Sequence, residues 1–452
     1  MARERLSEYL EAVGAQIRWK RARRPLLREL SDHIADQAAA FEAEGQSPGE
    51  ALAAAVAEMG EPEGGGRKLD RLHRPRGCWR LALTVAVLLG VGLALQLLAC
   101  RVTGDSASDY YFRRQALGLA LAVGVLVCLW FSDYTLLLRR KRMPIAAMAA
   151  LCILPPLFAI FCTHVDYHLT PYQFVSAFLY PYLLLPIPFA ALVATMRGSG
   201  PSRVFFCGLA ASLLSVIPLW FLSPPACLVS GASMLIVLLS AILLGWFRGK
   251  RRWNFLAALG AFSVTLALHL PLYLHSALRR LAVFFHADTM PNGIVYQRIR
   301  AGELPSSFVG TSYDLLLLEV SQALGRWVFW AAAAGIVLLA ALLLRRIFRL
   351  RSRTGKLTAL AALCPLLFQA VIYWLYNLGW WPSGALSLPF LSYGVTFLLV
   401  DAALAGVLLS VFRMDALVRD AVAASARPVS LPEALNIPLG RGSLHIEYRK
   451  KA

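Results

Sequence analysis

The sequence predicts an all-α polytopic membrane protein with about ten transmembrane helices, preceded by a small cytosolic helical domain. First, 58% of the 452 residues are apolar and 16% are charged, whereas soluble domains are about 45–50% apolar and about 25% charged. Second, from Cys78 onward the apolar runs are about 20 residues long, which is the length that crosses a bilayer. Third, no polar linkers divide these runs into soluble domains. A disordered chain is excluded by the high hydrophobicity.

The small helical domain is predicted over residues 1–75. Apolar side chains recur at helical spacing from Leu6 to Ile17 and again up to Phe41. Ser47 and Glu50 have the spacing of a capping box at the start of a third helix. The pattern, which ends in the string Met59-Gly60-Glu61-Pro62, resembles the permease-prefix domain of bacterial membrane proteins. An ordinary cytosolic helical appendage is the alternative, and it predicts the same topology.

The membrane domain is predicted over residues 76–413. Its apolar runs give ten candidate spans, each expected to be a helix that crosses about 30 Å of hydrocarbon. The expected spans are 78–100, 113–133, 143–163, 173–196, 204–223, 225–247, 254–276, 314–344, 357–379 and 385–412.

Loop charge predicts the orientation of these spans. The net charge is +19, and 23 of the 31 basic residues after residue 80 fall on alternate loops and on the chain from Arg413 onward, which includes the tail, 414–452. Basic residues concentrate on the cytosolic side of membrane proteins. We therefore expect both termini and the tail in the cytosol, and the charge needs no nucleic-acid partner to explain it.

The longest loop on the opposite side runs from Leu278 to Tyr313 and ends at a carboxylate. Asp314 stands where the next apolar run begins, and Glu319 follows five residues later. Carboxylates at a membrane boundary are candidate functional groups, and an aspartate at a helix start is also a common cap. The residues alone leave these two interpretations open.

Polar residues beside proline and glycine interrupt the last pair of spans, where they predict a broken helix. The string resembles the signature of the SEDS family, the FtsW/RodA/SpoVE proteins, with Val395 in place of the family's second glycine. The matching residues are Asn377, Gly379, Gly384, Leu388, Pro389, Phe390, Ser392, Tyr393 and Gly394.

The resemblance implies a catalytic aspartate at Asp314. Family members carry this residue in a His-Thr-Asp-Phe-type motif with a glycine eleven residues later, and Gly325 stands at that spacing. The flanking residues differ, since Ser312, Tyr313 and Leu315 replace the family's histidine, threonine and aromatic residue. The chain therefore resembles a divergent branch of the family.

The resemblance also implies an activity: an inverting peptidoglycan glycosyltransferase that polymerises lipid II at the outer face of the bacterial cytoplasmic membrane. Asp314 would be the general base. Cations would stabilise the diphosphate leaving group; they are either a divalent metal ion or the arginines that flank the long loop, Arg279, Arg280, Arg298 and Arg300. The implied partner is a class B penicillin-binding protein. No Cys or His spacing indicates metal ligands.

Two other functions remain open from the sequence. Broken helices and intramembrane polar residues are also typical of transporters, so a flippase for the lipid-linked precursor is one alternative. A non-catalytic membrane regulator of cell-wall synthesis is the other. Asp401, inside the last span, is costly in hydrocarbon unless it is paired or hydrated; the sequence leaves open whether it lines a cavity or contacts a polar neighbour.

Overall fold

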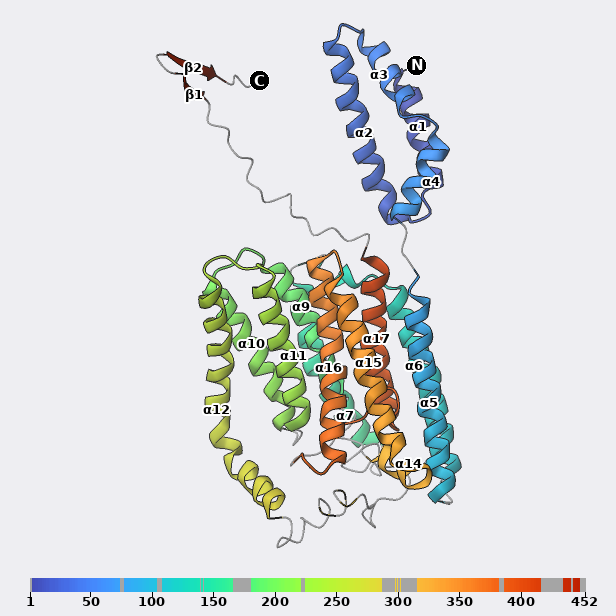
Figure 1. Cartoon of the computed structure of the whole chain (residues 1–452), viewed down its shortest axis with the longest axis vertical. Coiled ribbons are helices and arrows are strands. Elements are labelled where there is room, and N and C mark those ends of the chain that lie inside the picture. The colour runs from blue at the N-terminus through green and yellow to red at the C-terminus, as the bar shows by residue number, and fades with distance from the viewer. Residues whose placement is uncertain are drawn as a thin grey trace.

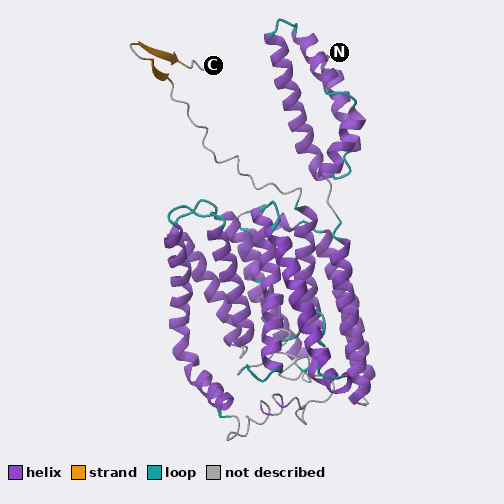
Figure 2. Ribbon diagram, in the orientation of Figure 1, coloured by secondary structure: helices purple, strands orange, loops and turns teal. Residues whose placement is uncertain are grey.

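The structure is a computed structural model, and helices dominate it (Figures 1 and 2). The predicted all-α membrane fold is confirmed. The residues that it describes are 2–73, 77–103, 108–138, 140, 142–165, 180–220, 224–286, 297, 299, 301, 315–381, 386–415, 434–439 and 442–447.

The N-terminal domain contains four helices: α1 (Ala2–Gln16), α2 (Lys20–Ala43), α3 (Pro48–Glu58) and α4 (Pro62–His73). Their shared core includes Val13, Ile34 and Ala55. The sequence predicts only the first three, because three successive glycines weaken the helical signal of α4. The structure explains these glycines: a Cβ on Gly66 would lie 2.9 Å from the carbonyl oxygen of Val13, so a glycine there allows α4 to pack closely on α1.

The predicted capping box at the start of α3 forms in part. The Ser47 hydroxyl donates to the Glu50 carboxylate at 2.6 Å, but the Ser47 side chain does not cap a backbone N–H of the helix. Hydrogen bonds from the Ser47 side chain and backbone lower the pKa of Glu50. The glutamate half of the motif is therefore present, and it favours the ionised carboxylate at the positive end of the helix.

The membrane domain agrees with the prediction of about ten spans. Six described helices are long and apolar enough to cross a membrane, and three shorter apolar segments and the 35-residue α12 accompany them. Their bounds are α5 (Trp79–Thr103), α6 (Ser108–Phe131), α7 (Met143–Val165), α9 (Pro186–Thr195) with the 3-10 turn η2 (Tyr180–Leu184) before it, α10 (Pro201–Trp220), α11 (Pro224–Leu243), α12 (Arg251–Phe285), α15 (Trp327–Phe348), α16 (Arg353–Asn377) and α17 (Val395–Met414). A second 3-10 turn, η1 (Tyr134–Leu138), follows α6.

The long apolar run 314–344 is not a single span. It divides into the short helix α14 (Leu316–Leu324) and the span α15. Gly325 ends α14 with a φ of 98°, a conformation that glycine adopts without the steric cost that other residues meet. The sequence shows only continuous hydrophobicity here, so the expected start of the span at residue 314 is wrong.

The chain enters and leaves the bundle on one side. Figure 1 shows that α5 begins and α17 ends at the same side, and that α14 lies at the other. An even number of crossings gives this arrangement. α16 and α17 form the centre of the bundle, with most of their residues buried, whereas α15 is largely exposed on its surface.

A short antiparallel hairpin lies in the tail, where the sequence predicts no strand. It comprises β1 (Ala434–Leu439) and β2 (Gly442–Glu447), and its register pairs Leu439 with Gly442. The hairpin adds no layer to the membrane bundle.

Candidate functional site

The second part of the family signature, from Leu388 to Gly394, lies in a non-helical turn inside the bundle. Residues 386–394 connect toward α17 without helical structure. Pro389, Phe390 and Leu391 line one pocket together with Ala370 of α16, which stands seven residues before the end of that helix at Asn377. At 1.5 Å per residue the turn therefore lies about 10 Å inside the end of α16. We call residues 386–394 the signature turn.

The signature turn is closed by its own hydrogen bonds. The Leu388 N–H donates to the Ser392 hydroxyl at 2.7 Å, and the Ser392 N–H donates to the Leu388 carbonyl at 3.1 Å. Phe390 has a φ of 67°, and it is the one non-glycine residue with positive φ in the described part of the chain. An L-residue in this region is held there by its surroundings.

Three neighbouring elements supply side chains that satisfy the backbone of the turn. Gln115 of α6 accepts from the Gly394 N–H at 3.0 Å. Tyr180 of η2 accepts through its hydroxyl from the Ser387 N–H at 2.6 Å. All the partners must come from the protein, because hydrocarbon offers none. Both side chains are buried, so the turn is held from two sides by groups that water does not reach.

The third of these side chains is Asp401 of α17, which is 1% exposed. Its Oδ2 accepts from the Phe390 N–H at 3.2 Å. Gln369 of α16, fully buried, lies beside the carboxylate, and its Oε1 accepts from the Ser387 hydroxyl at 3.5 Å. Of the two alternatives that the sequence leaves open, the structure therefore favours the one in which Asp401 contacts polar neighbours.

Glycines on α5 and α6 let the helices approach the turn. A Cβ on Gly92 would overlap the Phe390 carbonyl oxygen and lie 2.9 Å from the Cα of Leu391. A Cβ on Gly118 would lie 2.7 Å from the Val395 side chain. Val395 stands where the family has a second glycine, so Gly118 provides the space for its larger side chain.

The end of α16 fixes the helix that follows Asp314. The buried Tyr373 hydroxyl accepts from the Leu317 N–H at 3.0 Å. Leu315 packs in one cluster with Tyr376. The Asn377 amide donates to the Tyr373 carbonyl at 2.9 Å. The residue next to Asp314 is therefore held against the helix that leads into the signature turn.

Several predicted site residues lie outside the described residues. They are Asp314, Arg298, Arg300 and Gly384, together with the side chain of Arg280. Arg279 is exposed near the end of α12, and Figure 1 shows that end on the opposite flank of the bundle from α14. Arg326, at the start of α15, donates to the carbonyl of Ala301 at 3.1 Å, which joins the middle of the long loop to the span.

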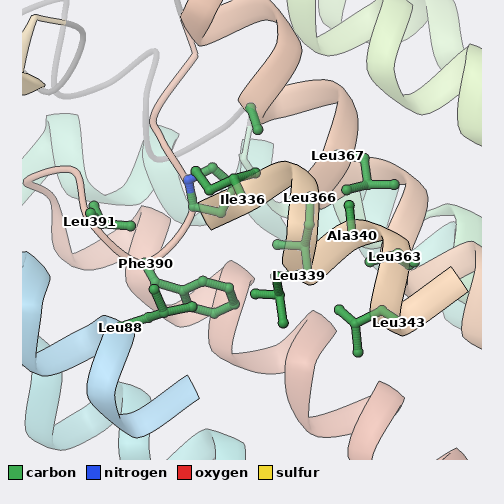
Figure 3. A pocket seen from close by; sticks show the side chains of 12 residues that line it. Leu88, Ile336, Leu339, Ala340, Leu343, Leu363, Leu366, Leu367, Phe390 and Leu391 are labelled. Atoms are coloured by element: carbon green, nitrogen blue, oxygen red, sulfur yellow. The ribbon is translucent and has the colours of Figure 1, made fainter. Parts of the chain in front are cut away.

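An apolar pocket lies beside the turn (Figure 3). Its volume is about 50 Å³, and aliphatic side chains of α5, α15 and α16 form its walls together with Pro389, Phe390 and Leu391. Figure 3 shows the Phe390 ring directed toward Leu339. Within the described residues no group of three His, Cys, Asp or Glu side chains is arranged to hold a metal ion.

Sequence reasoning did not single out Gln115, Tyr180 and Gln369. The available signal was the isolated amide in an otherwise apolar run, since polar groups at membrane depth are costly and usually have a specific partner. Gln369 meets that description, whereas Gln115 directly follows Arg113 and Arg114 and is not isolated. Tyr180 gives no such signal, because tyrosine is common near membrane interfaces.

Two comparisons with known proteins agree with this arrangement. Residues 324–416 match the family model of the FtsW/RodA/SpoVE cell cycle proteins. This segment contains α15, α16, the signature turn and α17. The fold is similar to that of a chain in a solved structure described as "Structural coordination of polymerization and crosslinking by a peptidoglycan synthase complex", with a TM-score of 0.53 and 18% identity over 75% of this chain and 98% of that one. No curated protein sequence matches the chain significantly.

The fold and the turn define a polytopic helical membrane protein with a non-helical segment packed inside its last pair of spans. The resemblance to the SEDS family is confirmed, because the family match covers the segment that carries the signature. Over residues 324–416 the protein is thus similar to the FtsW/RodA/SpoVE cell cycle proteins, and its fold is similar to that of a chain in a peptidoglycan synthase complex.

Proposed function

We propose that the protein is a peptidoglycan glycosyltransferase that polymerises lipid II at the outer face of the bacterial cytoplasmic membrane, with both termini in the cytosol. The observation that carries the proposal is the signature turn, which matches the family in sequence and is held inside the bundle by Gln115, Tyr180 and Asp401. A rigid, water-excluded frame of this kind supports a reaction that requires fixed geometry.

Asp314 is the proposed general base. The acceptor hydroxyl loses a proton as its oxygen attacks the anomeric carbon of the donor sugar, and a carboxylate within hydrogen-bond reach accepts that proton. The bond from the anomeric carbon to the diphosphate breaks as the new glycosidic bond forms. Leu315 packs in one cluster with Tyr376 of α16, and the Leu317 N–H donates to the Tyr373 hydroxyl, so the start of α14 is held against α16.

The diphosphate leaving group needs positive charge nearby. Arg280, Arg298 and Arg300 are the proposed contacts, since guanidinium groups bind phosphate in a bidentate manner. Arg279 is a weaker candidate, because it is exposed on the flank away from α14. The proposed partner is a class B penicillin-binding protein, which would crosslink the polymer.

Three buried polar side chains around the signature turn, Asp401, Gln369 and Gln115, favour one second candidate. Buried polar side chains at membrane depth also occur in transporters, so translocation of the lipid-linked precursor is the alternative. That activity would use these side chains and would not need Asp314.

Polymerisation by the purified protein tests the proposal. The protein, with and without candidate class B penicillin-binding proteins, is supplied with lipid II, and glycan chains are separated by gel electrophoresis. Asp314→Asn should reduce polymerisation by at least 10²-fold, the lower range for removal of a general base. Glu303→Gln is the matched control, since it neutralises a carboxylate of the same loop, and it should retain the wild-type rate.

The outcomes separate the candidate functions. Equal activity of wild type and Asp314→Asn would contradict the assignment of the base. If no condition yields polymer, the glycosyltransferase proposal is wrong. If the wild type and Asp314→Asn then both move the precursor across the membrane of reconstituted vesicles, the protein is a transporter.

A further inference from the structure

Phe390 adopts a backbone conformation that its own residue type disfavours. Its φ is 67°, where the Cβ of an L-residue crowds the backbone. The residue is also buried, at 7% exposure, and its N–H donates to the Oδ2 of Asp401 at 3.2 Å. The signature turn therefore contains one strained residue, Phe390, whose N–H donates to a carboxylate of α17.

We infer that Asp401 is a positioning residue for the signature turn: its carboxylate holds Phe390 in the left-handed conformation, so that Pro389, Phe390 and Leu391 form one wall of the apolar pocket. The inference uses the proposed function for one of its readouts only. It goes beyond the family signature, because Asp401 lies outside the matched string.

The carboxylate is suited to this role by its own environment. Asp401 lies on α17, whose residues are mostly buried. The packing of this helix therefore fixes the position of the Asp401 side chain beside the turn. Gln369 lies beside it and reaches Ser387 at the start of the turn. One polar cluster therefore contacts the turn at Ser387 and at Phe390.

Helix α5 packs closely against the Phe390 carbonyl and the Leu391 backbone of the turn. Gly92 of α5 lies against the carbonyl oxygen of Phe390 and the Cα of Leu391. The peptide units on both sides of Phe390 are therefore held, one by a hydrogen bond and one by steric contact. Loss of the Asp401 acceptor leaves a buried N–H without its partner, and rotation of φ to a negative value then moves the Phe390 ring out of the pocket.

Fluorine NMR of the full-length protein in detergent tests the inference without any assay of activity. The 23 phenylalanines are labelled with 4-fluorophenylalanine, and Phe390→Leu assigns the Phe390 resonance. Asp401→Leu, which removes the acceptor at similar size, should shift or broaden the Phe390 resonance. Asp401→Asn, which keeps an acceptor oxygen, should leave it in place.

The matched control is Ser410→Ala on the same helix. The Ser410 hydroxyl is also buried and donates to the Ser132 carbonyl at 2.7 Å, so its loss removes a buried hydrogen bond of α17 away from the turn. The Phe390 resonance should not change in this variant. An unchanged Phe390 resonance in Asp401→Leu, or an equal change in Ser410→Ala, would overturn the inference.

A thermal-stability cycle keeps the inference testable if Asp401→Leu is too unstable for NMR. Phe390→Gly removes the steric need for the acceptor, because glycine adopts positive φ freely. We expect Phe390→Gly to lower the melting temperature less in the Asp401→Ala background than in the wild type. Strictly additive losses would contradict the inference.

Polymerisation of lipid II is the second readout. We expect at least a tenfold loss in Asp401→Leu and less than a twofold loss in Asp401→Asn, compared at equal amounts of folded protein. If the wild type makes no polymer, the proposed function fails while the NMR result still decides the role of Asp401. A fully active Asp401→Leu with a displaced Phe390 resonance would show that the turn position is not needed for the reaction and would overturn this part of the inference.

Discussion

At the scale of single residues, one glycine of α5 allows the close approach of the signature turn, and a second glycine of the same helix does not. Gly92 faces the backbone of Phe390 and Leu391, whereas Gly90, on the same helix, has no atom within 4 Å of a Cβ built on it. The two glycines look alike in the sequence, but only Gly92 touches the turn. This contrast gives a matched pair of substitutions.

Gly92→Ala should destabilise the protein by about 1–3 kcal/mol, the usual cost of forcing extra atoms into a packed core. The atoms in the way belong to the backbone, so they cannot rotate aside. Gly90→Ala should be neutral or stabilising by up to about 1 kcal/mol, because alanine favours a helix more than glycine does. Thermal unfolding in detergent measures both, and equal effects of the two substitutions would contradict this account.

At the scale of elements, the break between α14 and α15 positions the residues that follow Asp314. Gly325 has a φ of 98°, and the Arg326 guanidinium bonds to the carbonyl of Ala301 next to it in space. The short helix can therefore turn away from the span and pack its Leu317 and Leu318 toward α16.

Gly325→Ala should loosen α14, because Gly325 has a φ of 98° and a ψ of 155°, a region in which a non-glycine residue costs about 1–3 kcal/mol. Hydrogen exchange by mass spectrometry should show faster exchange in Leu316–Leu324 and unchanged exchange in α16. The control is Gly335→Ala in the middle of α15, where an added Cβ meets no atom within 4 Å. Increased exchange in α14 in the control variant would count against a specific role of Gly325.

At the scale of the whole molecule, the basic loops and the direction of the spans indicate the same cytosolic side. α5 begins and α17 ends on one side of the bundle, while α14 lies on the other (Figure 1). The basic loops after α9 and α11, which carry Arg197 and Arg248, lie on the side where α17 ends, as the alternating direction of the spans requires. The proposed cytosolic side is thus a single face of the molecule.

Fusion reporters test this orientation. Green fluorescent protein attached after Ala452 should fluoresce, because it folds in the cytosol. Alkaline phosphatase fused after Glu303, in the long loop, should be active, because it folds outside the cytoplasmic membrane. An inactive phosphatase at Glu303, with an active one fused after Lys250, would reverse the assigned topology.

The sequence by itself determined the class of fold, the spans and the signature string. Hydrophobic run length is set by bilayer thickness, and loop charge indicates orientation. Both signals are local, so one sequence is enough to show them. The sequence also located the polar interruption at Asn377 and Gly379. It did not divide the run 314–344, because hydrophobicity does not report a single change of φ at Gly325.

Only the tertiary structure decided what the polar residues of the bundle do. Gln115 and Gly394 are 279 positions apart, and Tyr180 and Ser387 are 207 apart; no spacing rule links residues so distant. Asp401 was visible as a costly carboxylate, but its partner at Phe390 depends on a turn that folds back beside α17. The physical reason is that a broken helix in hydrocarbon must find its hydrogen bonds within the protein, and the packing of the helices determines which side chains are near enough to provide them.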